Sequence, residues 1–445
     1  MKKVFMSFIL IIFISISLMG CSCRQTSRFK SYKKNYSLSE LKMIASDSFK
    51  KINDIEYPDK EIEKVKISQD YLDAIINFSY NIYCNLNGNN VSFAPMGLYT
   101  ALSIASLACN NDDINSKIDQ VLGIGKARRN NNYPNFYKSN YFVNEYGTVQ
   151  MYNGLFSTNE YEINSDFIKE LTNYYCEAYS MNFANDSDIN KMLDWIDNHV
   201  QEKSFLKKSD LEISKDTVMY IFNTLYFNNK WANSFITSST YNDQFFLSND
   251  EKTDALFMTH SYPGTCYDYG TYLSAYDRYS NGYKIQYLVP KDLNDSIYDL
   301  VKDHNFLIED EDKLLIDKEG GSGLIINLSV PKFENECLIN FKEILKNIGL
   351  GILFDEYSHA FDYAYKNLNE SIYLSVVKQK NKITFSEDGT IVKSVTVSGM
   401  TKSAEARMTV YLDTIDIKLD RPFIYVIYDR NNTPIYMGNL DNPNA

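Results

Sequence analysis

The sequence is poor in the residues from which metal sites and nucleic-acid interfaces are built. Its 445 residues include 4 histidines, which lie far apart at positions 199, 260, 304 and 359. No H-E-x-x-H motif and no pair of C-x-x-C motifs occurs, which argues against a zinc site. Lys and Arg number 45 against 57 Asp and Glu, a net charge of −12, whereas binding nucleic-acid phosphates needs clustered basic residues. We therefore predict no metal, no cofactor and no nucleic-acid partner.

Catalytic motifs are lacking as well. The run Gly320-Gly321-Ser322-Gly323 is not the G-x-S-x-G turn that leads from a strand into a helix, and a simple turn is the better interpretation. No glycine-rich phosphate loop precedes a helix. The many carboxylates are typical of a solvated surface. We therefore do not expect an enzyme.

The first twenty residues predict a signal peptide instead of a structural element. The chain begins with the basic sequence M-K-K, and residues 4–19 form an uncharged apolar run that is short for a membrane span. The run ends in L-M-G-C, which resembles the lipidation motif of bacterial lipoproteins, with the Cys at position 21. We expect lipid on Cys21 to anchor the protein to a bacterial membrane, facing the periplasm or the cell exterior. The alternative is an ordinary secretory signal followed by an accidental Cys.

The rest of the chain is organised as a polar segment and one large domain. Residues 21–66 are rich in Ser, Lys, Asp and Glu and predict a tether. Residues 67–445 show no linker, repeat or low-complexity stretch, which favours a single domain. With 44% hydrophobic and 14% aromatic residues the chain can build a core. Most of the six cysteines after Cys21 are expected to be small buried side chains.

Helical and strand-like patterns occupy different parts of this domain. Apolar residues at helical spacing predict helices over residues 70–86, 95–109 and 188–201. Runs of β-branched and aromatic residues predict strands over residues 217–227, 283–289, 324–330, 372–385, 408–419 and 423–428. Helices first and strands later, without βαβ alternation, predict an α+β fold with a mainly antiparallel sheet.

The C-terminal third carries motifs that resemble those of the serpin family. S-E-D-G-T at residues 386–390 follows a predicted strand, D-R-P-F begins at residue 420, and M-G at residues 437–438 ends the last strand. Upstream, F-N-T-L-Y-F-N-N-K-W at 222–231, N-V-S-F-A-P at 90–95 and P-K-F at 331–333 are similar to serpin segments in the same order. Together the matches cover roughly residues 67–443.

This resemblance implies both a fold and a mechanism. The fold is a serpin domain with three mainly antiparallel sheets, eight or nine helices and an exposed reactive-centre loop at about residues 387–419. The mechanism, an established case of strand insertion, traps a protease as an acyl-enzyme while the cut loop enters the large sheet. We therefore predict a monomeric, extracytoplasmic inhibitor of serine-type endopeptidases, with cysteine-type enzymes as further targets. The alternative is a non-inhibitory serpin that binds or carries another molecule.

The start of the loop is the hinge from which insertion would proceed. By resemblance the hinge begins with Glu387, Asp388 and Gly389. Because side chains alternate along a strand, the inward-facing residues that follow are Thr390, Val392, Ser394 and Thr396. The family usually has alanines after the Thr, and the bulk of Val392 can slow insertion.

The position of the reactive bond follows from the distance to the hinge. Sixteen residues beyond Glu387 lies Ser403, so Ser403-Ala404 is the predicted bond, and it suits an elastase-like protease. A slip of one residue makes Lys402-Ser403 the bond and a trypsin-like protease the target. Counting back from Pro422 points near Tyr411 instead, because this loop is longer than the family usually has. Arg407-Met408 is the alternative cleavage site, where we expect cutting without trapping.

Two further regions are assigned by resemblance to control of sheet opening. At the top of the large sheet, termed the breach, Lys332 is expected to form an ion pair with Glu387, close to Trp231. In the middle of the sheet, termed the shutter, the serines and the histidine of the family are replaced together, which predicts a rewired contact. The residues at or near the shutter are Ala94, Gly97, Gln379, Asn90 and Asn223.

Overall fold

The structure of the chain is a computed structural model that describes residues 48–214, 217–249, 251–302, 304–315, 324–368, 370–392 and 413–445. The predicted signal peptide, Cys21, the glycine run and loop residues 393–412 lie outside these ranges. Among the helices of the described ranges, none has the length and apolar character that a membrane crossing needs. The same ranges contain no cluster of His, Cys, Asp or Glu side chains placed to hold a metal ion.

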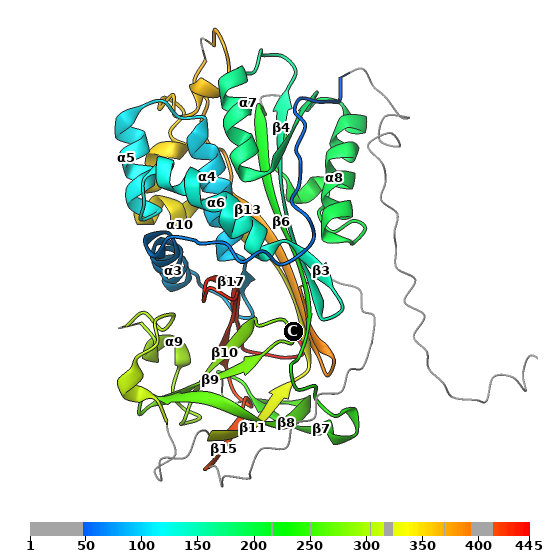
Figure 1. Cartoon of the computed structure of the whole chain (residues 1–445), viewed down its shortest axis with the longest axis vertical. Coiled ribbons are helices and arrows are strands. Elements are labelled where there is room, and N and C mark those ends of the chain that lie inside the picture. Colours follow the sequence, from blue (N-terminus) through cyan, green and yellow to red (C-terminus); the bar gives the residue numbers. More distant parts are fainter. Residues whose placement is uncertain are drawn as a thin grey trace, which may run out of the picture.

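A large sheet forms one half of the molecule (Figure 1). Its strand order is β1 (Lys50–Lys51), β5 (Cys176–Met181), β4 (Gly147–Thr158), β6 (Met219–Lys230), β14 (Gly389–Val392), β13 (Lys378–Ser386) and β12 (Phe333–Asn340), with β3 (Phe142–Asn144) paired to β4. Neighbours are antiparallel except β4 and β5. β14, the beginning of the predicted reactive-centre loop, thus lies between β6 and β13.

A second set of strands forms the other half around the long strand β8 (Lys252–Asp268). Through its first part β8 pairs with β7 (Tyr241–Phe246) and β11 (Leu324–Pro331), and β11 carries β15 (Thr414–Lys418) in parallel. Through its last part it continues into β9 (Tyr272–Arg278), β10 (Lys284–Pro290), β16 (Phe423–Tyr428), β17 (Pro434–Leu440) and β2 (Ser92–Phe93). The predicted α+β fold with three mainly antiparallel sheets is confirmed, two of them being continuous through β8.

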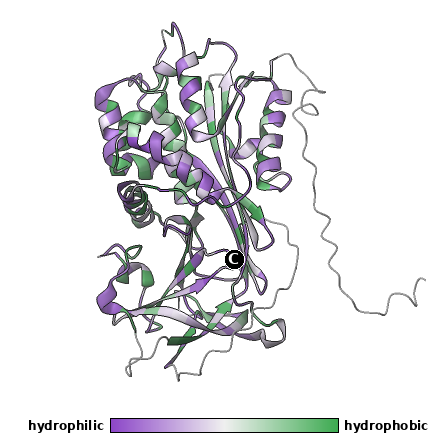
Figure 2. Ribbon diagram, in the orientation of Figure 1, coloured by the Kyte–Doolittle hydropathy of each residue, from purple (hydrophilic) through white to green (hydrophobic). Residues whose placement is uncertain are grey.

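Helices flank the large sheet on both faces. Figure 1 shows α8 (Asp186–Val200) on one side of β4 and β6, and α4 (Pro95–Leu107), α5 (Asp112–Val121) and α6 (Lys126–Asn140) on the other. α4 is apolar all round and almost entirely buried, as expected for a helix beneath a sheet. The other α-helices of the described residues are α3 (Gln69–Cys84), α7 (Ser165–Leu171), α9 (Ile297–Leu300) and α10 (Lys342–Leu345). In Figure 2, hydrophilic colour covers the outer faces of α5 and α6.

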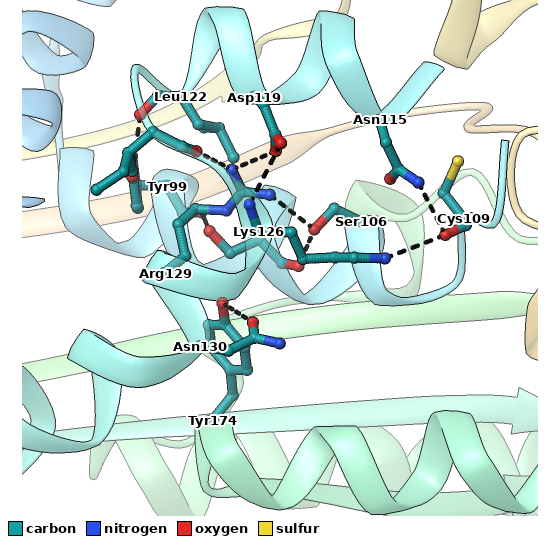
Figure 3. A network of polar contacts seen from close by, with 12 residues as sticks. Tyr99, Ser106, Cys109, Asn115, Asp119, Leu122, Lys126, Arg129, Asn130 and Tyr174 are labelled. Atoms are coloured by element: carbon teal, nitrogen blue, oxygen red, sulfur yellow. Dashed lines mark hydrogen bonds and ion pairs between the residues drawn. The ribbon is translucent and has the colours of Figure 1, made fainter. Parts of the chain in front are cut away.

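A buried arginine fixes the helices behind the sheet to one another (Figure 3). The side chain of Arg129 in α6 is 1% exposed and lies 2.7 Å from Asp119 in α5. It also donates to the hydroxyl of Ser106 in α4 at 3.2 Å and to the backbone carbonyl of Ile124. Because the carboxylate pairs with the guanidinium, the buried charge is compensated. Arg129 therefore ties α5 and α6 to α4, the helix that lies under the sheet.

Two expectations from the sequence are corrected by the structure. Residues 372–377 are not part of a strand; β13 begins only at Lys378. Part of the expected polar tether packs on the domain: β1 pairs with β5, and Asn53 bonds to the backbone of Cys176 and Ala178. The ring of Tyr57 lies 5.5–6.5 Å from four other rings, those of Tyr137, Tyr141, Tyr152 and Tyr175.

Candidate functional site

The hinge is already a strand of the large sheet. A tight turn at Glu387 and Asp388 connects β13 to β14, and Thr390 pairs with Phe385 on one side and Asn229 on the other. Gly389 is required at the turn because a Cβ atom there would lie 2.2 Å from the carbonyl oxygen of Asn229. The first four residues of the loop segment after the turn are therefore inserted between β6 and β13.

The side chains of β14 alternate as predicted. Thr390 is fully buried and its hydroxyl accepts a 2.8 Å hydrogen bond from Tyr279. Val392 is 5% exposed and faces the same interior, whereas Ile391 between them is only partly buried. Val392, whose bulk is expected to slow insertion, is accommodated in the core at this position.

Beyond Val392 the sheet is open. The pairing of the described strands connects β14 to both β6 and β13 but gives no ladder directly between β6 and β13. A cavity of about 550 Å³ occupies this place. Residues 219–225 of β6 and 378–382 of β13 line its sides, and small residues of α4 and its flanks also line it: Ala94, Gly97, Ala101, Ala105 and Ala108. We call this cavity the slot.

The predicted ion pair at the breach is present. Lys332 Nζ lies 2.8 Å from Glu387 Oε2 and 3.1 Å from Oε1. The hydroxyl of Thr240 donates to the same carboxylate at 2.9 Å. Partial burial alone would raise the pKa of the Glu387 carboxyl. The contacts to Lys332 and Thr240 outweigh this effect and hold the pKa below its usual value. The carboxylate is therefore well anchored at the turn where the loop begins.

Trp231 and the residues after it hold the turn from the other side. The indole Nε1 donates to the carbonyl of Ser386 at 2.9 Å. The backbone N–H of Trp231 donates to the carbonyl of Asp388 at 3.4 Å. The N–H of Phe235 donates to the carbonyl of Glu387 at 3.2 Å. The indole ring stacks on Tyr279 at 4.7 Å. Consecutive carbonyls of the turn are thus fixed by the segment 231–235.

The shutter contact is rewired, as the sequence predicts. The side-chain amide of Gln379 accepts from the N–H of Ala94 at 2.8 Å and donates to the carbonyl of Ala94 at 3.0 Å. Ala94 therefore contributes its backbone where the family has a side chain. A Cβ atom at Gly97 would lie 2.4 Å from Asn223 Oδ1, so Gly97 makes room for that amide. Asn223 in turn donates to Asn153 at 2.7 Å.

Among the described residues, Asn90 binds the C-terminal segment of the chain and not the shutter contact. Its side-chain oxygen accepts from the backbone N–H groups of Asp441 and Asn442 at 2.7 and 3.0 Å. Its side-chain amide donates to the carbonyl of Asn442 at 2.6 Å. Asn90 therefore ties the C-terminal end of the chain to the start of β2 and does not bond to Gln379 or Asn223 in the described contacts.

The remaining predicted site residues are outside the described ranges. These are Ser394, Thr396, Lys402, Ser403, Ala404, Arg407 and Met408. The described chain resumes at Asp413, whose carbonyl accepts from the N–H of Ile325 at 2.8 Å next to β15. Sequence reasoning missed Tyr279, Thr240 and Asn153, because no motif marks them and they reach the site only through the sheet register.

Comparisons with known proteins agree with this geometry. The family model Serpin (serine protease inhibitor) matches residues 73–443. Heparin cofactor 2 from Homo sapiens is 26% identical over 395 residues, which covers 82% of this chain and 73% of that protein. Among solved structures, the thermophilic serpin tengpin in its native state has a TM-score of 0.71 at 22% identity, covering 86% of this chain and 96% of that one. Thyroxine-binding globulin in complex with thyroxine has a TM-score of 0.65 at 18% identity, covering 84% and 99%. Because the family match spans most of its length, this chain belongs to the serpin family.

Proposed function

We propose that this protein is an inhibitor of serine-type endopeptidases, and also of cysteine-type enzymes, that works by insertion of its loop into the large sheet. The observation that carries the proposal is the position of β14. Four residues of the loop segment lie between β6 and β13, and the slot continues directly beyond Val392. A strand that enters the slot would pair with both neighbours and gain two ladders of hydrogen bonds.

Continuing the register of β14 gives the place of each later residue. Since Ile391 pairs with Thr384 and Asn228, Thr396 would reach Gln379 and Asn223 at the shutter. Lys393 would lie opposite Lys382 on the outer face, where Lys382 already has Glu334 2.8 Å away. The inward side chains Ser394 and Thr396 are small or of modest size, which suits the space above α4. Apart from Lys393, the residues from Thr390 to Thr396 that would enter the sheet in this register carry no charge.

The chemistry would be supplied by the target protease. Its nucleophile attacks the carbonyl of the reactive bond, the peptide nitrogen leaves as a new amino terminus, and an acyl-enzyme remains. Insertion of the freed strand then displaces the attached protease before water can complete the hydrolysis. In this proposal the chain itself performs no catalysis and acts as a monomer.

Target choice would depend on the loop residues. Cleavage at Ser403-Ala404 indicates an elastase-like protease, and cleavage at Lys402-Ser403 a trypsin-like one. Mass spectrometry of the C-terminal fragment from a denatured complex distinguishes these bonds. Trapping with a fragment that begins at Met408 or later would contradict this assignment.

We also propose that lipid on Cys21 anchors the inhibitor to a bacterial membrane, outside the cytoplasm. The support is the sequence at the N-terminus, with its basic start, apolar run and L-M-G-C. A protein retained in the membrane fraction and released by Cys21→Ser would bear this out.

The central experiment is formation of a covalent complex with a protease. The full-length protein is mixed with trypsin or elastase and separated under denaturing conditions, where a band of the combined mass indicates trapping. Thr390→Arg places a cation at a fully buried position and should turn the inhibitor into a substrate, because a buried unpaired charge is costly. Ile391→Arg is the matched control, since that side chain points outward and trapping should persist. Simple cleavage of the unaltered protein by every protease tried would favour the alternative, a binding or carrier serpin.

A further inference from the structure

The first residues of the described chain join the edge of the large sheet to α8. We call residues 48–57 the strap, which is the blue segment that runs beside α8 in Figure 1. Its backbone pairs with β5, and the N–H of Ile52 donates to the carbonyl of Ala178 at 2.7 Å. The side-chain amide of Asn53 donates to the carbonyl of Cys176 at 2.9 Å and accepts from the N–H of Ala178 at 2.8 Å. The strap is thus held along β5 by its backbone and by one side-chain amide.

α8 packs on the sheet through a small apolar core of its own, and the strap contributes to that core. Phe156 and Tyr179 of the sheet pack there with Trp195 and other buried residues of α8, apart from the main core of the molecule. The ring of Phe49 stacks on Tyr179 at 5.4 Å and lies 6.3 Å from the ring of Phe156. Lys191 of α8 holds its ammonium group 5.4 Å from the centre of the Phe49 ring. Phe49 therefore contacts both the sheet and α8.

A buried carboxylate binds the strap and α8 at the same time. Glu177 on β5 is 7% exposed, and its Oε1 atom lies 3.2 Å from Nζ of Lys51 in the strap. The indole of Trp195 in α8 donates to Oε2 at 2.9 Å, and the hydroxyl of Tyr179 donates to the same oxygen at 2.8 Å. Burial alone would raise the pKa of Glu177, but these hydrogen bonds and the charge of Lys51 hold the pKa below its usual value. The strap and α8 therefore both depend on the position of one ionised carboxylate.

A second carboxylate joins the same elements at the other end of α8. Asp188, in the first turn of the helix, has a fully buried side chain and accepts from the hydroxyl of Ser48 at 2.6 Å. Its Oδ2 atom also accepts from the N–H of Asn182, the residue that directly follows β5, at 3.0 Å. Lys191 lies 3.8 Å from Asp188 on the same face of the helix. The strap, the edge of the sheet and the start of α8 therefore meet at Asp188.

We propose that the strap fastens α8 to the sheet, so that detaching the strap from β5 loosens α8. The coupling runs through the contacts of Ser48, Phe49 and Lys51. Asn53 bonds to β5 and, among the described residues, makes no hydrogen bond to α8. Since a coupling free energy between two parts of one structure is reciprocal, loosening α8 must also loosen the strap.

The coupling matters because α8 helps to cover the slot. Ile196 and Val200 of α8 line the slot, and so do Phe205 and Leu211 in the segment that connects α8 to β6. The strap lies at the far edge of the sheet, with β5, β4 and β6 between it and the slot. A change in the N-terminal segment can therefore reach the place where a strand would insert. The consequence for inhibition rests on the proposed function: with α8 loosened, a strand should enter the slot faster.

The test is hydrogen exchange of the uncleaved full-length protein at neutral pH. Asn53→Ala removes two hydrogen bonds between the strap and β5. Amides of α8, residues 186–200, should then exchange about three- to thirtyfold faster relative to amides of β16. Asn111→Ala is the matched control, because it removes two hydrogen bonds of a side-chain amide at the start of α5, on the other side of the sheet. It should leave the ratio of α8 to β16 exchange unchanged.

The reciprocal variant is Trp195→Phe, which removes from α8 the donor to Glu177. The amide of Ile52 in the strap should then exchange about two- to tenfold faster relative to β16. A ratio of α8 to β16 exchange that Asn53→Ala leaves unchanged, or that Asn111→Ala raises equally, would overturn the proposal. If Asn53→Ala does not fold, an Ile52 amide that Trp195→Phe leaves unaffected overturns it alone. The experiment uses no protease, so its outcome is separate from whether the protein traps one.

Discussion

Replacing Gln379 by Leu tests the rewired shutter. The amide of Gln379 makes both of its hydrogen bonds to the backbone of Ala94, at 2.8 and 3.0 Å. The carbonyl of Ala94 keeps its bond from the N–H of Leu98, but the N–H of Ala94 loses its acceptor. Ala94 is 5% exposed, and a buried polar group without a partner costs about 1–3 kcal/mol. We expect Gln379→Leu to lower the free energy of unfolding by about 2 kcal/mol.

The assay is urea unfolding of the uncleaved protein, followed by circular dichroism at neutral pH. Gln120→Leu on the exposed side of α5 is the matched control. A substitution at such a surface position should change the free energy of unfolding by no more than about 0.5 kcal/mol. The stability of Gln379→Glu should lie between those of the unaltered protein and Gln379→Leu. Its carboxylate can accept from the N–H of Ala94 but cannot donate to the carbonyl of Ala94. A Gln379→Leu protein as stable as the control would refute the account of the shutter.

Two other side chains give further predictions. Glu387→Gln should lower stability at pH 7, and the difference from the unaltered protein should disappear as the pH falls below the ordinary glutamate range. The reason is that the pKa of Glu387 is lowered in the fold, so its contribution is present at neutral pH and lost on protonation; urea titrations at several pH values measure it. Tyr57→Ala should cost about 1–3 kcal/mol in the same assay, because the ring packs against four tyrosines. Tyr57→Phe should be nearly neutral, since the hydroxyl has no hydrogen-bond partner among the described residues.

Local patterns predicted the elements that have clear ends in the sequence. β16 has the predicted bounds, Phe423–Tyr428, and α3, α4 and α8 end within a few residues of expectation. β4 was missed because its sequence mixes polar, small and apolar residues while most of its positions are buried, so neither an apolar run nor an alternation marks it. The strand predicted at 372–385 began too early, since Ile372 packs in the core without ladder partners.

The candidate site also contains residues that the sequence predicts and residues that it does not. The ion pair of Lys332 with Glu387 and the inward faces of Thr390 and Val392 follow from family resemblance and strand alternation. The partners Tyr279 and Thr240 could not be predicted, because they reach the hinge only once the sheets have formed. Residues 48–57 were taken as tether because their composition is polar, yet backbone pairing and one tyrosine suffice to attach them to the domain.

The most direct test of loop insertion is the melting temperature of the protein before and after one cut in the reactive-centre loop. A protease that is not trapped can make the cut, and calorimetry then compares the two forms. Freed from its far end, the segment after Val392 can enter the slot and pair with β6 and β13, so the cleaved form should melt at a clearly higher temperature. A cleaved form that melts at or below the temperature of the intact protein would contradict the proposed mechanism.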